Sequence, residues 1–362
     1  MPSLPLSYPV FEKERLEPMK RRLAVVLLAV LLVVTISCTS VQGGHYSYEV
    51  WQGESQGLTI PWVEDAAALS QESGTMRFYF MSGEGQHMAS SQDTKYGDSC
   101  LITFPGGEVM LIDGARVDYA PTLVENLRQL GIKRIDHLVL SHMHDDHYGG
   151  LISANGILAN FEVGTMYING TLNLKPTVVE KFDKAMAVFK PNLNILSQGD
   201  SFAIGDVAVD VFNPPADLIG KSFGTIAMNN TSLSLKFTYK DFSALFSGDI
   251  YIEAEYELIK QYASQLDVDL VKASHHGRNT SNSREWAQAT TPKVVVATSG
   301  NAIDEIVYAN YARSGARVFT DTLDGYVRVV SNGLDCITTT SRPRTDDSYA
   351  KYDLEASTKK KK

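Results

Sequence analysis

The sequence predicts an α/β fold in which helices cover sheets. Short apolar runs with strand-like spacing recur along most of the chain, and several of the intervals between them have helical spacing. Such a mixed order is typical of sheets that pack against helices. A length of 362 residues and a hydrophobic content of 44% suffice for one large domain or two modest ones.

The predicted elements begin near residue 76. Residues 76–81 and both halves of 101–112 have strand spacing, and Pro105-Gly106-Gly107 supplies a hairpin turn between those halves. A helix is predicted over residues 119–130, with Gly131 at its end. Further strands are predicted at 135–140, 165–168, 207–212, 233–239, 242–246, 268–272, 294–298 and 318–320, and further helices at 177–189, 251–261 and 283–288.

Residues 1–38 are similar to a bacterial secretory signal peptide of the lipoprotein type. Lys20-Arg21-Arg22 precedes an apolar run, Leu23 to Ile36, that is shorter than the roughly twenty residues of a membrane-spanning helix. Cys38 then stands where a lipid would be attached, which predicts secretion across the cytoplasmic membrane and a lipid anchor at the cell envelope. An uncleaved anchor helix is the alternative, and palmitate labelling that Cys38→Ala abolishes would identify the lipoprotein.

Polar segments flank the globular part. Residues 39–74 are rich in Gly, Ser and Gln and are predicted to form a linker with room for one edge strand. Residues 341–362 are polar, end in Lys359 to Lys362, and are predicted to be a disordered, solvated tail. The net charge of −9 argues against an extended nucleic-acid-binding face, although a small positive site is compatible with it.

The stretch from Ser141 to His147 carries the strongest chemical pattern in the chain. It places His142, His144, Asp146 and His147 between a predicted strand and a predicted turn at Gly149-Gly150, and it holds three of the eight histidines. Imidazole and carboxylate groups together are typical ligands of zinc, iron or manganese. A solvated polar loop is the alternative, but the flanking strand and glycines favour a metal site.

Two more predicted strands end in residues of the same kind. Ser247-Gly248-Asp249 follows the strand at 242–246, and His275-His276-Gly277 follows the strand at 268–272. Asp249 could instead be a turn or cap residue of the next helix, and the paired histidines could lie on the surface. Five of the eight histidines nevertheless fall in two places, which favours one shared metal site.

In this order the motifs over residues 76–335 resemble the metallo-β-lactamase superfamily. Asp113 matches its first motif, residues 142–147 its second, Asp249 its fourth and His275-His276 its fifth. Within the superfamily the chain looks most like the hydrolase domain of ComEC-type competence proteins and its free-standing relatives. The strings that carry this narrower resemblance are Gly97-Asp98-Ser99, Asn230-Thr231-Ser232-Leu233, Ser247-Gly248-Asp249, His275-His276-Gly277, Thr280-Ser281, Thr320-Asp321 and Asp324-Gly325.

The resemblance implies a four-layer αββα sandwich for residues 75–340, with one or two Zn²⁺ or Mn²⁺ ions at one edge of two facing sheets. The implied metal ligands are His142, His144, Asp146, His147, Asp249 and His275. Asp146 and His276 are the implied catalytic residues. Because neighbouring residues at a strand end point apart, one of His275 and His276 should ligate and the other contact substrate, and the sequence leaves that choice open. Asp113 would orient a ligand histidine.

The chain departs from the superfamily pattern in two places. No histidine lies between His147 and His275, so the third-motif ligand is missing. Asn230 could fill that gap as a weak oxygen ligand or a substrate contact, or it could be a capping residue. Ser299-Gly300-Asn301 also lacks the histidine that often follows it. Arg278, like Lys272, could meet a phosphate or lie at the surface.

The resemblance implies a metal-dependent hydrolase that uses a metal-bound hydroxide on phosphodiester bonds of nucleic acid or another phosphate ester. An acyl hydrolase, such as a lactonase, thioesterase or β-lactamase, is the enzymatic alternative. A non-catalytic binding lipoprotein that retains the fold is a third hypothesis, which the missing histidine supports. The expected partners are a phosphate-ester or small-molecule substrate and a membrane reached through the N-terminal lipid or signal anchor.

Overall fold

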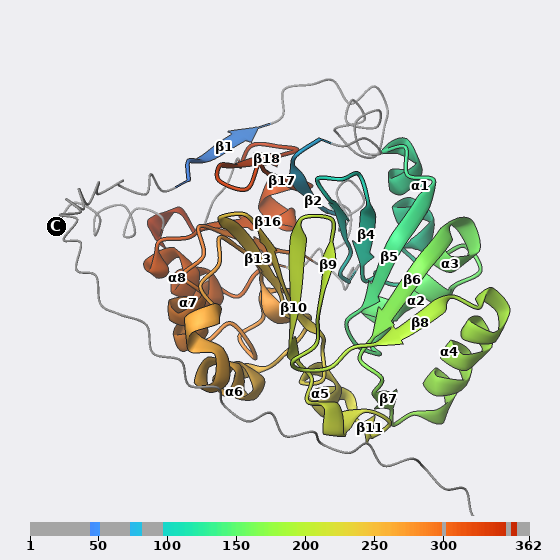
Figure 1. The fold of residues 1–362 in the computed structure, drawn as a ribbon. Coiled ribbons are helices and arrows are strands. Elements are labelled where there is room, and N and C mark those ends of the chain that lie inside the picture. Colours follow the sequence, from blue (N-terminus) through green and yellow to red (C-terminus); the bar gives the residue numbers. More distant parts are fainter. Residues whose placement is uncertain (1–43, 51–72, 82–96, 299–301, 345–348, 353–362) are drawn as a thin grey trace, which may run out of the picture. The chain divides into compact units, whose positions relative to one another are not determined.

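The computed structural model describes residues 44–50, 73–81, 97–298, 302–344 and 349–352 (Figure 1). The predicted signal peptide, most of the predicted linker and the Ser299-Gly300-Asn301 element lie outside these ranges. Among the residues described, none of the helices has both the length and the apolar character needed to cross a membrane.

The larger sheet has nine strands in the order β1-β18-β17-β2-β3-β4-β5-β6-β8. Its strand β3 forms an antiparallel hairpin with β4, whereas β4, β5, β6 and β8 run parallel to one another. The strands are β1 (Tyr46–Val50), β2 (Met76–Phe80), β3 (Cys100–Thr103), β4 (Val109–Ile112), β5 (Arg134–Leu140), β6 (Glu162–Ile168), β8 (Asn192–Ile195), β17 (Val327–Ser331) and β18 (Cys336–Thr340).

The second sheet has seven strands in the order β16-β15-β14-β13-β12-β10-β9. The four strands from β13 to β16 run parallel, and β12 pairs antiparallel with β13 and β10. The strands are β9 (Ser201–Ile204), β10 (Val207–Asn213), β12 (Ser234–Tyr239), β13 (Phe242–Phe246), β14 (Leu270–Lys272), β15 (Val294–Ala297) and β16 (Arg317–Thr320). Strands β7 (Leu172–Asn173) and β11 (Ser222–Phe223) form a separate two-stranded parallel sheet.

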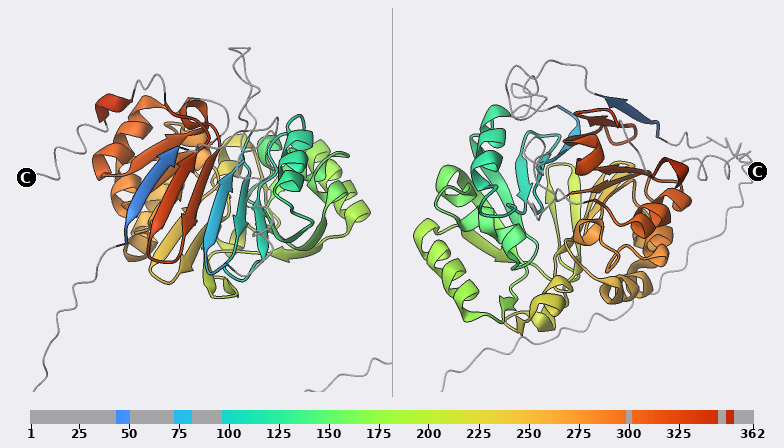
Figure 2. Two further views of the ribbon diagram at one scale, coloured as in Figure 1. Left: turned by 90° about the horizontal axis from the view of Figure 1, so that it is seen from above. Right: turned by 180° about the vertical axis from the view of Figure 1, so that it is seen from behind.

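Helices cover the outer faces of the two sheets (Figures 1 and 2). On the larger sheet lie α1 (Ala120–Gln129), α2 (Asp145–Ile152), α3 (Ile157–Asn160) and α4 (Pro176–Phe189); on the second sheet lie α6 (Ile252–Tyr262), α7 (Arg284–Thr290) and α8 (Glu305–Ser314). The remaining short helices are η2 (Ala216–Leu218), α5 (Thr225–Asn229), η3 (Ala263–Gln265), η4 (Ser274–Gly277) and α9 (Asp321–Asp324).

The central core lies between the sheets and is rich in aromatic rings. Phe78 stacks on Phe246 with ring centroids 5.9 Å apart, and Phe237 meets Phe246 edge-on at 5.9 Å. Two further apolar clusters join each sheet to its own helices. This arrangement confirms the predicted four-layer αββα sandwich, because each helix layer and each sheet face finds an apolar partner.

The predicted strands and helices are confirmed, with ends that shift by at most three residues. The Gly149-Gly150 pair is a correction, because it lies inside α2 and does not form a turn. A Cβ at Gly150 would come within 1.9 Å of the Gly114 carbonyl oxygen. The two glycines therefore let α2 approach the chain that follows β4 closely, and this holds the second motif against the first.

The predicted linker contains the edge strand for which it left room, whereas the predicted tail differs from its prediction. Strand β1 lies within the predicted linker and pairs in parallel with β18, so it belongs to the larger sheet. In the predicted tail, Arg344 donates to both carboxylate oxygens of Asp324, and the Tyr349 ring stacks on Tyr308 at 4.5 Å. The chain is thus packed onto the fold beyond Ser341, because Arg344 pairs with a buried carboxylate and Tyr349 stacks on a buried aromatic ring.

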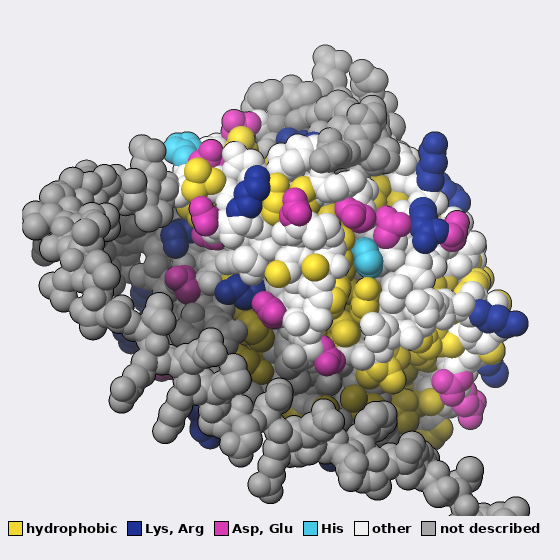
Figure 3. Space-filling view, viewed as in Figure 1, with side chains coloured by type: hydrophobic (Ala, Val, Ile, Leu, Met, Phe, Trp, Pro, Cys, Tyr) yellow, Lys and Arg dark blue, Asp and Glu magenta, His cyan; other side chains and the backbone are white. Residues whose placement is uncertain are grey.

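Strand β8 ends the larger sheet and keeps an apolar surface. Leu193 and Ile195 are 42% and 47% exposed. Apolar side chains gather in this region in Figure 3, whereas acidic and basic side chains are interspersed over the rest of the face shown.

Candidate metal centre

Four strands bring the polar motifs to one edge of the sandwich. Asp113 directly follows β4 and His142 lies two residues after β5, which are parallel neighbours in the larger sheet. Asp249 follows β13 and His276 follows β14, which are parallel neighbours in the second sheet. Because parallel strands end at the same edge, segments far apart in sequence meet at the join of the two sheets.

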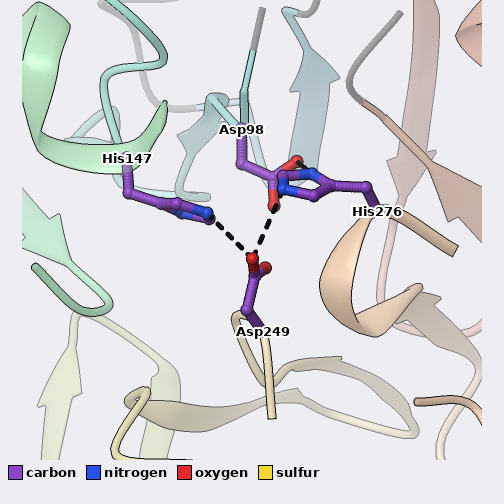
Figure 4. A group of neighbouring side chains, drawn as sticks. All are labelled: Asp98, His147, Asp249 and His276. Atoms are coloured by element: carbon purple, nitrogen blue, oxygen red, sulfur yellow. Dashed lines mark hydrogen bonds and ion pairs between the residues drawn. The ribbon is translucent and has the colours of Figure 1, made fainter. Parts of the chain in front are cut away.

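Four donor groups converge at this join. His147 Nε2 and His276 Nε2 lie 3.2 and 3.3 Å from the same oxygen, Oδ2 of Asp249, and Figure 4 shows the two rings approaching it from opposite sides. His276 Nε2 also lies 3.2 Å from Asp146 Oδ2, and His147 Nε2 lies 3.9 Å from Asp146 Oδ1. A tetrahedral cation with ligands at about 2.1 Å separates its donors by roughly 3.4 Å. These residues could therefore hold one metal ion.

A second carboxylate holds each of these two rings from its other nitrogen. Asp113 Oδ2 lies 2.8 Å from Nδ1 of His147, and Asp113 is itself fixed by the backbone N–H and hydroxyl of Ser141 at 2.8 and 2.7 Å. Asp98 Oδ1 lies 3.1 Å from Nδ1 of His276. Such pairs direct the Nε2 lone pair of each imidazole toward the centre. Asp98 is thus an orienting group, and Asp146 takes the fourth position on the Nε2 side.

Lys272 has a role that the sequence did not suggest. Its ammonium group is buried, pairs with Asp98 and lies 3.9 Å from Asp249 Oδ1, so it neither meets substrate nor lies at the surface. Burial raises the pKa of Asp98, but the charges of Lys272 and His276 together outweigh burial and leave that pKa well below its usual range. Asp98 therefore stays ionised and keeps its hydrogen bond to Nδ1 of His276.

His142 and His144 form a second, less complete half of the site. His142 Nε2 and His144 Nδ1 lie only 2.9 Å apart, and burial lowers the pKa of both rings. Both are thus neutral near pH 7, which is the form that ligates a metal. Among the residues described, the buried atoms His144 Nε2 and Asp249 Oδ1 accept or donate no hydrogen bond. Unsatisfied buried donors and acceptors of this kind fit a site built for a cation.

The two remaining rings carry protons in the absence of a cation. Burial lowers the pKa of His147 and His276, but the surrounding carboxylates, of which Asp249 contributes most, together outweigh burial and raise both pKa values well above the usual range. Their protons balance the surrounding carboxylates. Binding of a divalent ion would release these protons and take over the same electrostatic role.

The backbone of the short helix η4 determines which histidine of the pair points toward the centre. His275 and His276 both adopt left-handed backbone angles, with φ of 46° and 58°. His276 turns toward Asp249, whereas His275 bonds Thr280 and packs its ring 4.9 Å from that of Tyr251. The assignment of His275 as the ligand and His276 as the substrate contact is therefore reversed by the geometry, because a positive-φ turn, and not strand alternation, sets both directions.

A buried network holds this strained turn in place. The Asn282 side chain accepts from Ser274 N–H at 2.9 Å and donates to the Ser274 carbonyl at 2.8 Å. Glu255 of α6 in turn accepts from the backbone N–H groups of Ser283, at 3.0 Å, and Asn282. Burial raises the pKa of Glu255 to about 7, although its hydrogen bonds from Ser283 act to lower it.

The other two predicted site residues lie beside the centre. Asn230 uses its side-chain oxygen to accept from the backbone N–H of Tyr251 at 2.8 Å, which is the residue before α6. This contact matches the capping interpretation. Arg278 follows η4, is half-buried, and donates its backbone N–H to the His275 carbonyl. Its side chain is not among those that line the cavity in front of the centre.

That cavity has a volume of about 490 Å³. Asp146 and Asp249 of the centre line it, together with Lys175 and Lys181 from the region of α4. Its lining comprises Met143, His144, Asp145, Asp146, Tyr148, Asn173, Lys175, Val178, Lys181, Thr225, Asn229, Asp249, Tyr251 and His275.

The fold and this donor set define a class of proteins with a metal centre at the edge of an αββα sandwich. The chain belongs to the metallo-β-lactamase superfamily, since the sequence model of that superfamily matches residues 93–297. Its members are generally metal-dependent hydrolases. The predicted family is therefore confirmed.

Within the superfamily the chain is ComEC-like. It is 26% identical over 237 residues to ComE operon protein 3 of Bacillus subtilis, a match that covers 61% of this chain and 29% of that protein. It is 29% identical over 220 residues to competence protein ComA of Neisseria gonorrhoeae, covering 60% of this chain and 28% of that protein. The match thus spans less than a third of each relative. Among solved structures, the metallo-β-lactamase fold protein YhfI of Bacillus subtilis is 11% identical with a TM-score of 0.44, and the match covers 68% of this chain and 96% of that one.

Asp113→Asn is expected to weaken Zn²⁺ or Mn²⁺ binding by about 10- to 100-fold, because the amide cannot hold the His147 ring as the carboxylate does. Competition with a fluorescent chelator measures the change. Asp136→Asn is the matched control, since Asp136 lies within β5 and its Oδ2 accepts from the N–H of Val109 at the start of β4. Equal affinities in the two variants would contradict the orienting role of Asp113.

The raised pKa of Glu255 predicts a pH dependence of stability. The carboxyl is protonated in the fold up to about pH 7 but ionises near 4.5 in the unfolded chain. Its contribution is therefore fully present below pH 4.5 and is lost as pH rises through 7, by up to about 3 kcal/mol. Urea unfolding should show that Glu255→Gln gains stability relative to the wild type between pH 5 and 8. A difference that does not change with pH would refute this.

Proposed function

We propose that this chain is a metal-dependent hydrolase of phosphodiester bonds. One observation carries the proposal: Asp146 and Asp249, which contact the rings of His147 and His276, line a cavity that is also lined by two lysines. A cation centre facing Lys175 and Lys181 suits an anionic ester, because positive charge on both sides can neutralise a phosphate. The names of the two competence relatives are consistent with a nucleic-acid substrate.

Two groups of residues would hold the cations. Asp146, His147, Asp249 and His276 would bind the first, and His142 and His144 would bind the second with Asp249 between them. Zn²⁺ or Mn²⁺ suits this mixture of imidazole and carboxylate. When bound, such ions lower the pKa of water toward neutrality and polarise the phosphoryl oxygen.

The side chains around the cavity would orient the reaction. Burial raises the pKa of Asp146, but the charge of His147 together with the contacts of His276 outweighs burial and lowers that pKa far below its usual value, so Asp146 is ionised. It can therefore accept a hydrogen bond from the attacking water and orient that water so that a lone pair of the water oxygen points at the phosphorus. Burial lowers the pKa of His275 to about 4, so this ring is neutral and can donate an N–H to the phosphoryl oxygen.

Turnover of bis(p-nitrophenyl) phosphate tests the proposal. Activity should require Mn²⁺ or Zn²⁺, disappear with a chelator, return when the ion is restored, and fall at least about 100-fold in Asp146→Ala. Asp118→Ala is the matched control, since this carboxylate is exposed and pairs with Arg116. Inactivity with every metal and diester would reject the proposal. Preferential hydrolysis of lactones or nitrocefin would favour an acyl hydrolase, and a chain that takes up no metal would favour a binding protein.

The proposed location is the bacterial cell envelope, outside the cytoplasmic membrane. The support is the signal-like segment before Cys38, which lies outside the described residues. There the enzyme would meet extracellular or periplasmic phosphodiesters. Palmitate labelling of the wild type but not of Cys38→Ala remains its test.

A further inference from the structure

The gap left by the missing third histidine has a candidate occupant next to the residue that the sequence suggested. Asn229 closes α5 and is 2% exposed, and it lines the same cavity as His144 and Asp249. Its side-chain oxygen is buried, and no donor within the described ranges reaches it. A buried amide oxygen without a partner costs free energy unless something supplies positive charge or a hydrogen.

Strand pairing places the segment that follows Asn229 beside Asp249. Strands β12 and β13 are antiparallel, and Leu235 pairs with Phe246, so the loop before β12 lies against the loop after β13. Ser232 in the first loop accepts the backbone N–H of Asp249 in the second, at 3.0 Å. Asn229 lies three residues before Ser232 and lines the same cavity as Asp249, so a segment without a histidine lies beside the centre.

The two consecutive asparagines have different surroundings. The Asn230 side-chain oxygen accepts the backbone N–H of Tyr251, whereas the Asn229 side-chain oxygen has no donor within the described ranges. Asn229 and Tyr251 line the same cavity. Of the two amide oxygens, that of Asn229 is therefore the one available to a ligand.

We infer that the carboxamide oxygen of Asn229 is the third protein donor to the cation held by His142 and His144. The inference rests on the proposed metal-dependent function and extends it to a residue that neither the motifs nor the comparisons assign. A neutral carbonyl oxygen binds a divalent ion more weakly than an imidazole does, and it favours Mn²⁺ over softer ions. This half of the centre should accordingly bind its ion more weakly than the half built from Asp146, His147, Asp249 and His276.

Titration of the metal-free chain with Mn²⁺ tests the inference without any substrate, by calorimetry and by electron paramagnetic resonance. The wild type should take up two ions, one tightly and one weakly. Asn229→Ala should retain the tight ion, which also reports a folded centre, and bind the weak one at least tenfold less well. Asn230→Ala is the matched control and should keep both ions while lowering the Tm.

Asn229→Asp keeps the shape and adds charge, so it should tighten the weak ion, and this variant decides the matter if the alanine variant does not fold. Two unchanged ions in Asn229→Ala would overturn the inference, as would a wild type that takes up only one. A variant with both ions intact but a raised KM would assign Asn229 to the substrate instead. A wild type without diesterase activity would reject the proposed function. The metal titration would still test the role of Asn229, because it needs no substrate.

Discussion

The burial of negative charge at the join of the two sheets is the constraint on which the rest of the site depends. Asp98, Asp113 and Asp249 are almost fully buried, and Asp146 is largely so. Isolated charges in such a place would cost several kcal/mol each, so every one needs a partner. Lys272 and two protonated imidazoles supply part of the balance, and a divalent cation at the same point would supply it more completely.

The scaffold meets this constraint by building the centre from strand ends and fixing each ring twice. His147 is held between Asp113 and Asp249, and His276 is held between Asp98 and Asp249. Neither ring can rotate without losing a charged contact. This rigidity keeps the nitrogen atoms at metal-binding separations, and the cavity in front leaves one side open to a substrate.

Much of this architecture could be predicted from local sequence patterns. Alternation and apolar runs gave the strands, Pro105-Gly106-Gly107 gave the hairpin, and the run from His142 to His147 marked the centre. These features depend on residues within a few positions of one another. The ordered motifs then added the four-layer arrangement, which no single segment contains.

What escaped prediction depends on contacts between distant residues or on backbone angles. Asp98 gains its role from Lys272, 174 residues away, and nothing near it in sequence marks that pairing. The choice of His276 over His275 follows from a left-handed turn that Asn282 and Glu255 hold in place. Asn230 was predicted to fill the gap of the third motif from its position in the sequence. Only the structure shows that Asn229 is the residue with a buried, unpaired side-chain oxygen.

X-ray diffraction from crystals of the Zn²⁺-loaded protein, measured on both sides of the zinc absorption edge, tests the central claim most directly. Anomalous scattering should give a peak enclosed by Nε2 of His147, Nε2 of His276 and the carboxylates of Asp146 and Asp249. A protein without an anomalous peak at that point, or with zinc bound only elsewhere, would show that the buried carboxylates are balanced by other means and that this edge of the sandwich is not a metal centre.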